Sequence, residues 1–477
     1  MRSLVLTVLS LFLFACAMGP NYSRPDIPTS DSFRMAEESK ELPSLANMPW
    51  WELYQDEELQ RLIRIALEEN KDLKRAIASI DEFQARLFTA RMDFAPQFSA
   101  AGNFPVARQG GFAVPGFPNP FNHYGQGSLA WELDIWGRIR RANEAGLADL
   151  LAREENRRAV TLQIVGGVAQ SYFDLRQFDM QLEIAKHTLV AWEESVRIGQ
   201  ARLRQGLINK LDVDQFEAER ENAAARIAEL KRQMIQKENE LSVLLGRNPS
   251  QIVRGRSLTE QVMPPVVPAG LPSELLQRRP DVMQAEQQLV AATARIGVAQ
   301  AERFPKLSLT GLLGVASPQL TDLVSPGTDF GVLAPALTGP LLNAQTLGFQ
   351  QRAVEAQAKQ AVAQYEQTIL VAFREVEDAL AGVSTTREQA AAQEREITAL
   401  RSALHLATLR YKGGLANYLD VLIAQRRLFE SELALAATRR LHLVSVVQLY
   451  KALGGGWSPT HAYGAVPISP RLEQSSK

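Results

Sequence analysis

The sequence predicts a mainly α-helical protein with a transmembrane β-barrel. In this fold an internally duplicated chain contributes four strands per copy to a trimeric α/β-barrel, and its long helices form a tunnel. Three observations support the prediction. The chain of 477 residues is rich in Ala, Gln, Glu and Arg and has only 7% aromatic residues, which is typical of long helices. Its two halves repeat one another, and each half holds two segments in which polar and apolar residues alternate.

The composition argues against several function classes. Lys and Arg number 52 against 53 Asp and Glu, which is unlike the basic excess of a nucleic-acid binder. A single cysteine and five scattered histidines provide neither an internal disulfide nor a Cys/His zinc cluster. Gly454-Gly455-Gly456 lacks the following Lys-Ser or Lys-Thr of a phosphate loop, and no nucleophile–base or carboxylate pair stands out. We therefore expect no enzyme, no catalytic or metal-binding residues, no cofactor and no nucleic-acid partner.

Residues 1–15 predict a lipoprotein signal peptide. Arg2 precedes a mostly apolar run, residues 4–14, that is too short to span a bilayer. The run ends at Leu13-Phe14-Ala15-Cys16, which resembles a bacterial lipobox. We therefore expect cleavage before Cys16 and a covalent diacylglycerol and acyl chain (palmitate) on it, which would hold the chain on a membrane. An ordinary signal peptide with a chance cysteine is the alternative.

Two further segments flank the folded part of the chain. Residues 16–50 predict a Pro-rich, lipid-anchored extended arm, and residues 458–477 predict a flexible C-terminal tail. Ala17 stands where an Asp would favour inner-membrane retention, so delivery to the outer membrane is compatible with the sequence. No later stretch approaches eighteen unbroken apolar residues, so any membrane crossing must use strands.

A duplication divides the remaining chain into a first repeat, residues 51–260, and a second repeat, residues 261–457. Each repeat reads helix, strand, loop, strand, long helix, turn, helix. Segments of the first repeat recur in the second at a nearly constant shift of 208 or 209 residues, which is far too long for a solenoid unit. The matched segments are Pro96-Gln97-Phe98-Ser99 with Pro305-Lys306-Leu307-Ser308, and residues 206–213 with residues 414–421.

Proline-free stretches predict the long helices. A helical pattern over residues 55–94 is closed by Pro96, and residues 138–204 contain no proline. At 1.5 Å per residue, the second stretch would make a rod of ~100 Å. Its counterpart covers residues 343–411, where the apolar stripe is wider than a coiled-coil seam and suits a helix with neighbours on both sides. A large helical bundle is the alternative.

Four segments of about ten residues alternate between polar and apolar side chains, as membrane-barrel strands do. In one of them Leu129, Trp131 and Leu133 share a face, while polar residues occupy the other. A soluble hairpin pair packed under the helices is the alternative. The predicted strands lie near residues 97–107, 124–135, 306–316 and 328–338.

Four strands would leave two open sheet edges, which are not tolerated in lipid. The chain must therefore oligomerise if these strands span a membrane. Three copies would supply about twelve strands, which is within the size range of known barrels. We expect a homotrimer surrounded by outer-membrane lipid.

Four motifs along the chain identify a possible family: Cys16 followed by Gly19-Pro20-Asn21-Tyr22-Ser23-Arg24-Pro25, then Trp131-Glu132-Leu133-Asp134-Ile135-Trp136-Gly137-Arg138, Arg278-Arg279-Pro280-Asp281-Val282, and Tyr450-Lys451-Ala452-Leu453-Gly454-Gly455-Gly456-Trp457. Together they resemble the outer-membrane factor (TolC-like) family over nearly the whole chain after the signal. The fit is best to its lipoprotein branch, which serves resistance-nodulation-division efflux pumps.

The resemblance implies a passive exit duct in the outer membrane of a Gram-negative bacterium, extending into the periplasm. Its partners would be a periplasmic adaptor (membrane fusion) protein and an inner-membrane resistance-nodulation-division transporter. Its cargo would be drugs or other toxic small molecules. An exit duct of a type I protein secretion system and a non-conducting, lipid-anchored helical scaffold are the alternatives.

The resemblance also implies a periplasmic gate where the helix-turn-helix pairs around Asp212 and Asp420 coil inward. Tyr411 matches a helix-linking tyrosine of the family, and Asp420 matches a constricting aspartate. Arg426 matches an arginine that some members use near this tip.

The sequence departs from the family at Ala416, where one branch has a linking arginine, and at Ile423, where a second acidic residue would be expected. We therefore expect a single acidic ring, formed by three copies of Asp420, that attracts cations to a narrow throat. Helix capping is an alternative explanation of the aspartates. Asn209 and Asn417 fit N-caps, and Asp212 and Asp420 then fall at the third helical position, where a carboxylate is favourable.

Overall fold

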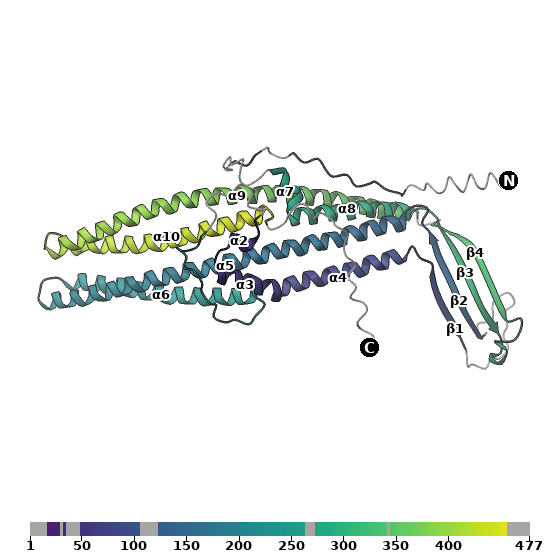
Figure 1. Ribbon diagram of the computed structural model, residues 1–477, viewed down its shortest axis with the longest axis horizontal. Coiled ribbons are helices and arrows are strands. Elements are labelled where there is room, and N and C mark those ends of the chain that lie inside the picture. The colour runs from purple at the N-terminus through teal and green to yellow at the C-terminus, as the bar shows by residue number, and fades with distance from the viewer. Residues whose placement is uncertain are drawn as a thin grey trace. The chain divides into compact units, whose positions relative to one another are not determined.

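The computed structural model describes residues 17–28, 32–34, 48–104, 123–262, 272–340 and 344–455 (Figure 1). The predicted signal peptide 1–15, Cys16 and the predicted tail 458–477 lie outside the described residues. The chain divides into two compact units, and each unit draws on both halves of the sequence. Unit 1 comprises Met1–Ile27, Ala78–Glu155 and Gln284–Gln367, and unit 2 comprises Pro28–Ile77, Asn156–Met283 and Thr368–Lys477.

The described helices confirm the mainly α-helical prediction. The proline-free stretches form the two longest, α5 and α9. Among the described residues, none of the helices has the length and apolar character needed to cross a membrane. The helices are α2 (Trp50–Leu53), α3 (Glu57–Glu69), α4 (Lys71–Met92), α5 (Arg138–Arg204), α6 (Lys210–Leu244), α7 (Pro272–Arg278), α8 (Pro280–Ala301), α9 (Ala344–Lys412) and α10 (Tyr418–Ala452).

The single helix predicted over residues 55–94 is two helices, α3 and α4, which are separated at Asn70. The Asn70 side-chain oxygen accepts hydrogen bonds from the backbone amides of Asp72 at 2.8 Å and Leu73 at 3.1 Å, so it begins α4. Its amide nitrogen donates to the Leu244 carbonyl at 2.8 Å and ties the break to the end of α6. Apolar periodicity continues across Asn70, and for this reason the pattern alone did not reveal the break.

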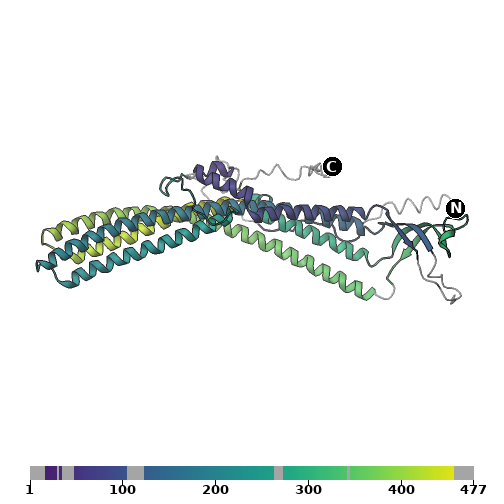
Figure 2. The same cartoon turned by 90° about the horizontal axis from the view of Figure 1, so that it is seen from below.

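Unit 2 contains two helical hairpins, α5–α6 and α9–α10, whose helices lie side by side (Figures 1 and 2). Large apolar side chains between them are fully buried, among them Phe173 of α5 and Val447 of α10. Each such side chain stabilises the unit by roughly 1.5–3 kcal/mol. Buried Asp174 of α5 accepts a hydrogen bond from Arg440 of α10 and lies 3.2 Å from the Lys237 ammonium of α6, so one carboxylate links three helices.

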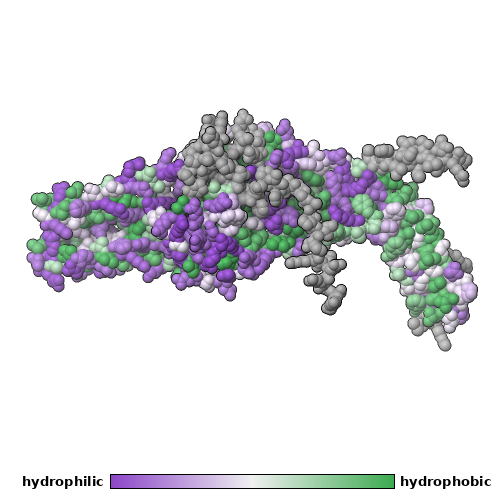
Figure 3. All heavy atoms as spheres, viewed as in Figure 1, coloured by the Kyte–Doolittle hydropathy of each residue, from purple (hydrophilic) through white to green (hydrophobic). Residues whose placement is uncertain are grey.

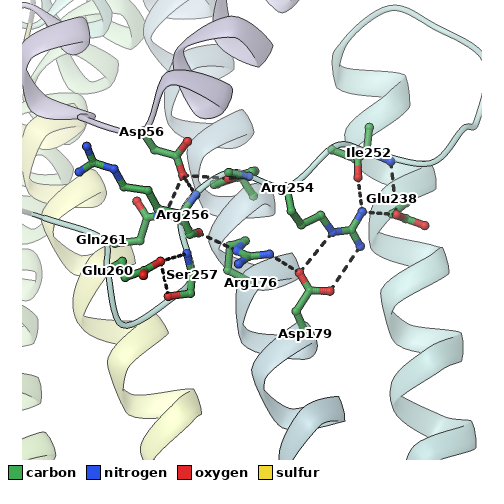
Figure 4. A network of polar contacts seen from close by, with 12 residues as sticks. Asp56, Arg176, Asp179, Glu238, Ile252, Arg254, Arg256, Ser257, Glu260 and Gln261 are labelled. Atoms are coloured by element: carbon green, nitrogen blue, oxygen red, sulfur yellow. Dashed lines mark hydrogen bonds and ion pairs between the residues drawn. The ribbon is translucent and has the colours of Figure 1, made fainter.

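Buried Asp56 organises the start of α3 and the segment that follows α6 (Figure 4). Its Oδ1 atom accepts from the Glu58 backbone amide at 3.0 Å and caps α3. Its Oδ2 atom accepts from the Tyr172 hydroxyl at 2.9 Å, the Arg256 backbone amide at 2.9 Å and the Gln261 side chain at 2.8 Å. Burial opposes ionisation, but the hydrogen bonds from Gln261 and Tyr172 hold the pKa of the Asp56 carboxyl below its usual value.

A second ionic group holds the same segment from the other side (Figure 4). The Arg254 guanidinium contacts Glu238 of α6 and lies 3.2 Å from Asp179 of α5. Asp179 also accepts from Arg176 at 2.7 Å. The segment from residue 246 to residue 262 is therefore fixed by side chains of α5 and α6, although it has no regular structure.

Unit 1 contains one antiparallel sheet in the order β1-β2-β3-β4. The strands start within one residue of the predicted positions, and the first is shorter than predicted because residue 104 is not in the strand and residues 105–107 lie outside the described part. Within this sheet, β1 and β4 each pair on one side only. The strands are β1 (Gln97–Asn103), β2 (His123–Leu133), β3 (Lys306–Ser317) and β4 (Asp329–Thr338).

The strand register separates an apolar face from a more polar face. Phe98, Leu129, Gly311 and Leu333 are successive cross-strand partners on one face, and Figure 3 shows hydrophobic residues covering the strands. Phe98 is 80% exposed and Leu333 is 65% exposed, so the described residues do not cover this face. The other face carries Ser, Thr, Gln or Asn side chains from β1, β2 and β3, and β4 contributes one polar residue, Thr338.

Ion pairs join β2 to the start of α5. The Glu132 carboxylate accepts two hydrogen bonds from the Arg138 guanidinium, both at 2.9 Å. Asp134 accepts from the backbone amides of Ile139 and Arg140, each at 2.9 Å, and so caps α5.

The N-terminal arm packs on the helices of unit 1. The buried Arg141 side chain donates to the backbone carbonyls of Met18 at 3.0 Å and Gly19 at 3.2 Å. Gly19 has a φ of +88°, and a Cβ on it would lie 2.4 Å from the Gly297 Cα atom of α8. A glycine is therefore required on each side of this contact.

Candidate functional site

The two helical hairpins of unit 2 end in turns of the same construction. Gly206 and Gly414 both have a φ of +72°, the left-handed region in which glycine ends helices. After α5, the Leu207 amide donates to the Arg202 carbonyl at 3.0 Å, and after α9 the Leu415 amide donates to the Arg410 carbonyl at 2.9 Å. The predicted gate residues lie on or beside these turns.

The first turn leads into a complete capping box. The Asn209 side chain accepts from the Asp212 backbone amide at 3.0 Å, and the Asp212 carboxylate accepts from the Asn209 backbone amide at 3.3 Å. Helix capping therefore accounts for Asp212 in this protomer.

The second turn has its N-cap residue at the expected position, Asn417, but it does not repeat the capping box. Asn417 is the N-cap residue of α10 by backbone conformation, but its side chain makes no capping hydrogen bond. Asp420 is exposed, and its carboxylate has no hydrogen bond or ion pair with any described residue. Arg426, six residues further along α10, is exposed as well, and the structure does not bring it into contact with Asp420.

Tyr411 lies in a cluster that joins all four long helices. The Arg202 guanidinium of α5 lies over the Tyr411 ring of α9, 4.7 Å from its centroid. Tyr411 meets Tyr418 of α10 edge to face at 4.8 Å, and Tyr418 meets Phe216 of α6 at 4.2 Å. Tyr418 is largely enclosed, and this burial raises its pKa above the ordinary value. The arrangement links the end of one hairpin to the other.

The fit of Phe216 depends on a glycine near the C-terminal end of α5. A Cβ on Gly199 would lie 2.6 Å from two ring carbons of Phe216, whose side chain is 1% exposed. Phe216 also packs with Trp192 and Val196 of α5.

Arg202, Tyr418 and Phe216 were not singled out by the sequence analysis. At the equivalent positions of the other repeat, 208 residues away, stand Arg410, Lys210 and Ala424. Tyr418 and Phe216 thus differ in kind from their counterparts. Aligning the two repeats and looking for unlike residues beside the turns would have pointed to the cluster.

A groove of about 700 Å³ lies between α5, α9 and α10. Ion pairs at 2.7 Å between Arg401 and Glu432 and between Arg439 and Glu394 link α9 to α10 along it. The predicted gate residues do not line it. Among the described residues, no group of three or more His, Cys, Asp or Glu side chains is placed to hold a metal ion.

Comparisons with known proteins agree with this geometry. The profile of the family described as "Outer membrane efflux protein" matches residues 62–247 and 271–455. The antibiotic efflux pump outer membrane protein ArpC of Pseudomonas putida is 34% identical over 462 residues, which cover 95% of each chain. The cation efflux system protein CusC of Escherichia coli is 32% identical over 452 residues, which cover 94% of this chain and 97% of CusC.

A solved structure shares the fold as well. The open state of the Neisseria gonorrhoeae MtrE outer membrane channel superposes with a TM-score of 0.82 at 30% sequence identity. The match covers 92% of this chain and 98% of MtrE.

Proposed function

The chain belongs to the outer membrane efflux protein family, and from this membership we propose that it is a passive, homotrimeric exit channel for toxic small molecules. It is the outer-membrane channel component of an efflux system. In the proposal it catalyses no reaction, and the driving energy comes from an inner-membrane transporter of the resistance-nodulation-division type through a periplasmic adaptor protein.

One observation carries the proposal: a four-stranded sheet with an exposed apolar face and two single-sided edge strands, β1 and β4. Lipid is a suitable neighbour for the apolar face, and pairing of β4 with β1 of the next copy would satisfy the edges. Three copies would close about twelve strands around a polar interior.

The cargo is proposed from the names of the relatives. ArpC is named for antibiotics and CusC for cations, and both are small-molecule efflux components. These names favour small-molecule efflux over a protein-secretion duct.

Planar-bilayer recording of the detergent-purified protein tests the channel. We expect a trimer by light scattering, with stepwise currents of uniform size. A strictly monomeric protein that gives no current would contradict the proposal and support the scaffold alternative. A matched sample whose trimers are dissociated before reconstitution should give no current steps. This control excludes currents from contaminating porins.

Lipid anchoring at Cys16 is the second part of the proposal, and the contacts of the residues that follow Cys16 support it. Ala17, the next residue, lies against Gly137, where a Cβ would come within 2.7 Å of the Ala17 Cα atom. The Met18 amide donates to the Trp136 carbonyl at 3.0 Å, just beyond β2. Acyl chains on Cys16 would thus start beside the end of a strand. Mass spectrometry of the N-terminal peptide should show a diacylglycerol and an acyl chain, and an unmodified Cys16 would refute the anchor.

The gate is the third part of the proposal. Tyr411, held by Arg202 and Tyr418, would link the two hairpins in the closed state, and three copies of Asp420 would face the axis at the throat. Arg426 is proposed as a further tip residue because it is exposed on the same helix. Asp212 is assigned to capping rather than to the throat, on the strength of its capping box.

A further inference from the structure

The more polar face of the sheet carries very little charge. In the four described strands the ionisable side chains, apart from a tyrosine, are His123, Glu132, Lys306 and Asp329. The register places His123 and Asp329 in the same alternation as Leu129 and Leu333, on the apolar face and at the loop end. Glu132 and Lys306 therefore remain as the charges of the polar face, and both lie at the end of the strands nearest the helices.

Two carboxylates at this end of the strands, those of Glu132 and Asp134, are already paired. Glu132 has Ser308 as its cross-strand partner, two residues from Lys306, and both of its oxygens accept from Arg138 at 2.9 Å. Asp134 follows the last residue of β2, and its carboxylate oxygens accept hydrogen bonds from the backbone amides of Ile139 and Arg140 at the start of α5.

Lys306 itself is uncompensated. It is exposed, and its ammonium has no ion pair with any described residue. Its cross-strand partner is Thr338, a neutral residue on the same face. Within the described strands the charges of Glu132 and Lys306 on this face sum to zero, and because Arg138 of α5 pairs with Glu132, Lys306 is left as the unpaired charge of these strands.

We propose that Lys306 makes the helix-proximal end of the barrel favour anionic and neutral solutes over cations, in opposition to the acidic ring proposed at Asp420. The inference rests on the proposed trimeric channel, in which the polar face lines the interior and three Lys306 ammonium groups form a ring. At low ionic strength such a ring acts over the width of the pore, since the Debye length is ~10 Å at 0.1 M and ~30 Å at 0.01 M.

The test is the reversal potential of purified trimers in a tenfold KCl gradient at low ionic strength. Lys306→Gln should shift the chloride-to-potassium permeability ratio toward potassium by roughly twofold, and Lys306→Glu by more. An unchanged ratio in Lys306→Gln channels of normal conductance would overturn the proposal.

A moved charge provides the matched control. In the Lys306→Gln background, Thr338→Lys restores a positive charge on the same face, whereas Leu337→Lys places one on the apolar face. We expect the first to restore the wild-type ratio and the second to leave it shifted. Equal restoration by both would overturn the assignment of Lys306 to the interior.

A failure of the Lys306 proposal can be told apart from a failure of the channel proposal. If Lys306→Gln fails to assemble, Thr338→Lys in the wild-type background should raise chloride preference, and no change there would count against the proposal. A wild-type protein that gives no current at all contradicts the proposed channel function, not the role of Lys306 within it.

Discussion

At the scale of single residues, the duplication places an aspartate at equivalent positions of the two repeats, and the two side chains have different environments. Asp212 is part of a capping box, while its counterpart Asp420 is exposed with no partner among the described residues. The sequence predicted N-caps at Asn209 and Asn417, and both residues hold that position, but only Asn209 makes the side-chain hydrogen bond of a cap. Side-chain rotamers at an exposed turn depend on neighbours from other helices, here Tyr411 and Tyr418, and such neighbours are not visible in local spacing.

This difference predicts opposite phenotypes for the same substitution. Asp212→Asn should lower the stability of the trimer by about 0.5–1 kcal/mol through loss of the capping box, with conductance unchanged. Asp420→Asn should leave the melting temperature unchanged and lower single-channel conductance in KCl roughly twofold, because the acidic ring no longer attracts cations to the throat. Thermal unfolding and planar-bilayer recording check both. Unchanged conductance in Asp420→Asn would remove Asp420 from the gate.

The contact between Arg202 and Tyr411 gives a second residue-scale prediction. Arg202→Gln removes a cation–π contact worth about 0.5–1 kcal/mol, so the closed state should loosen and cells should become sensitive to large antibiotics. Arg202→Lys should keep part of the effect. Arg410→Gln is the matched control because Arg410 is the counterpart of Arg202 in the other repeat and is exposed. Equal sensitivity in both Gln variants would show that the ring contact has no role in closure.

At the scale of elements, the strands were predictable and one helix break was not. Alternation marked β1 to β3 because one face of the sheet is apolar and a shift of one residue would reverse every side chain, whereas β4 has apolar residues on both faces and alternates only weakly. Pro335 is accommodated in β4, which lies at the edge of the sheet within the chain. The break at Asn70 was missed because it depends on a hydrogen bond to the distant Leu244 carbonyl.

Two glycines of α5 should respond oppositely to alanine. In Gly167→Ala the added Cβ has 3.9 Å to its nearest neighbour, so better helix propensity should stabilise the protein by about 0.5–1 kcal/mol. In Gly199→Ala the Cβ would meet the Phe216 ring, and overpacking should cost about 1–3 kcal/mol. Denaturant or thermal unfolding in detergent measures both. A stabilising Gly199→Ala would mean that Phe216 can move aside freely.

At the scale of the whole molecule, the repeats and the compact units do not coincide. The duplication was readable because matched segments keep a nearly constant shift, but each unit combines residues of both repeats. Contacts such as Asp56 with Arg256 and Gln261 bring together positions that are about 200 residues apart in the chain. Such pairings follow from the packing of helices and are not encoded in any local motif.

Asp56 makes the stability of the molecule depend on pH. Its pKa is lower in the folded protein than in the unfolded chain, so its contribution is complete above the unfolded value of about 3.9 and is lost as pH falls through the folded value. Asp56→Asn should cost on the order of 2 kcal/mol at pH 7, and the difference from wild type should shrink below about pH 4. Thermal unfolding across pH 3–8 checks this.

Asp72→Asn is the control for the pH series. Asp72 is exposed and lies 3.2 Å from an exposed Arg75, so its removal should change stability by less than about 0.5 kcal/mol at any pH. A pH profile of Asp56→Asn that runs parallel to wild type down to pH 3 would show that the Asp56 carboxylate does not titrate with folding.

The glycine-to-glycine contact between the arm and α8 implies an order of events during biogenesis. Gly19 can settle only against a helix that includes Gly297, and Arg141 must already be in place to hold the Met18 and Gly19 carbonyls. During export from the N-terminus, the contact surface for the arm is incomplete until residue 297 has crossed the inner membrane, because Gly297 follows Arg141 in the chain. The arm therefore stays undocked throughout that interval, and the lipid attachment proposed at Cys16 would take place before docking covers the arm.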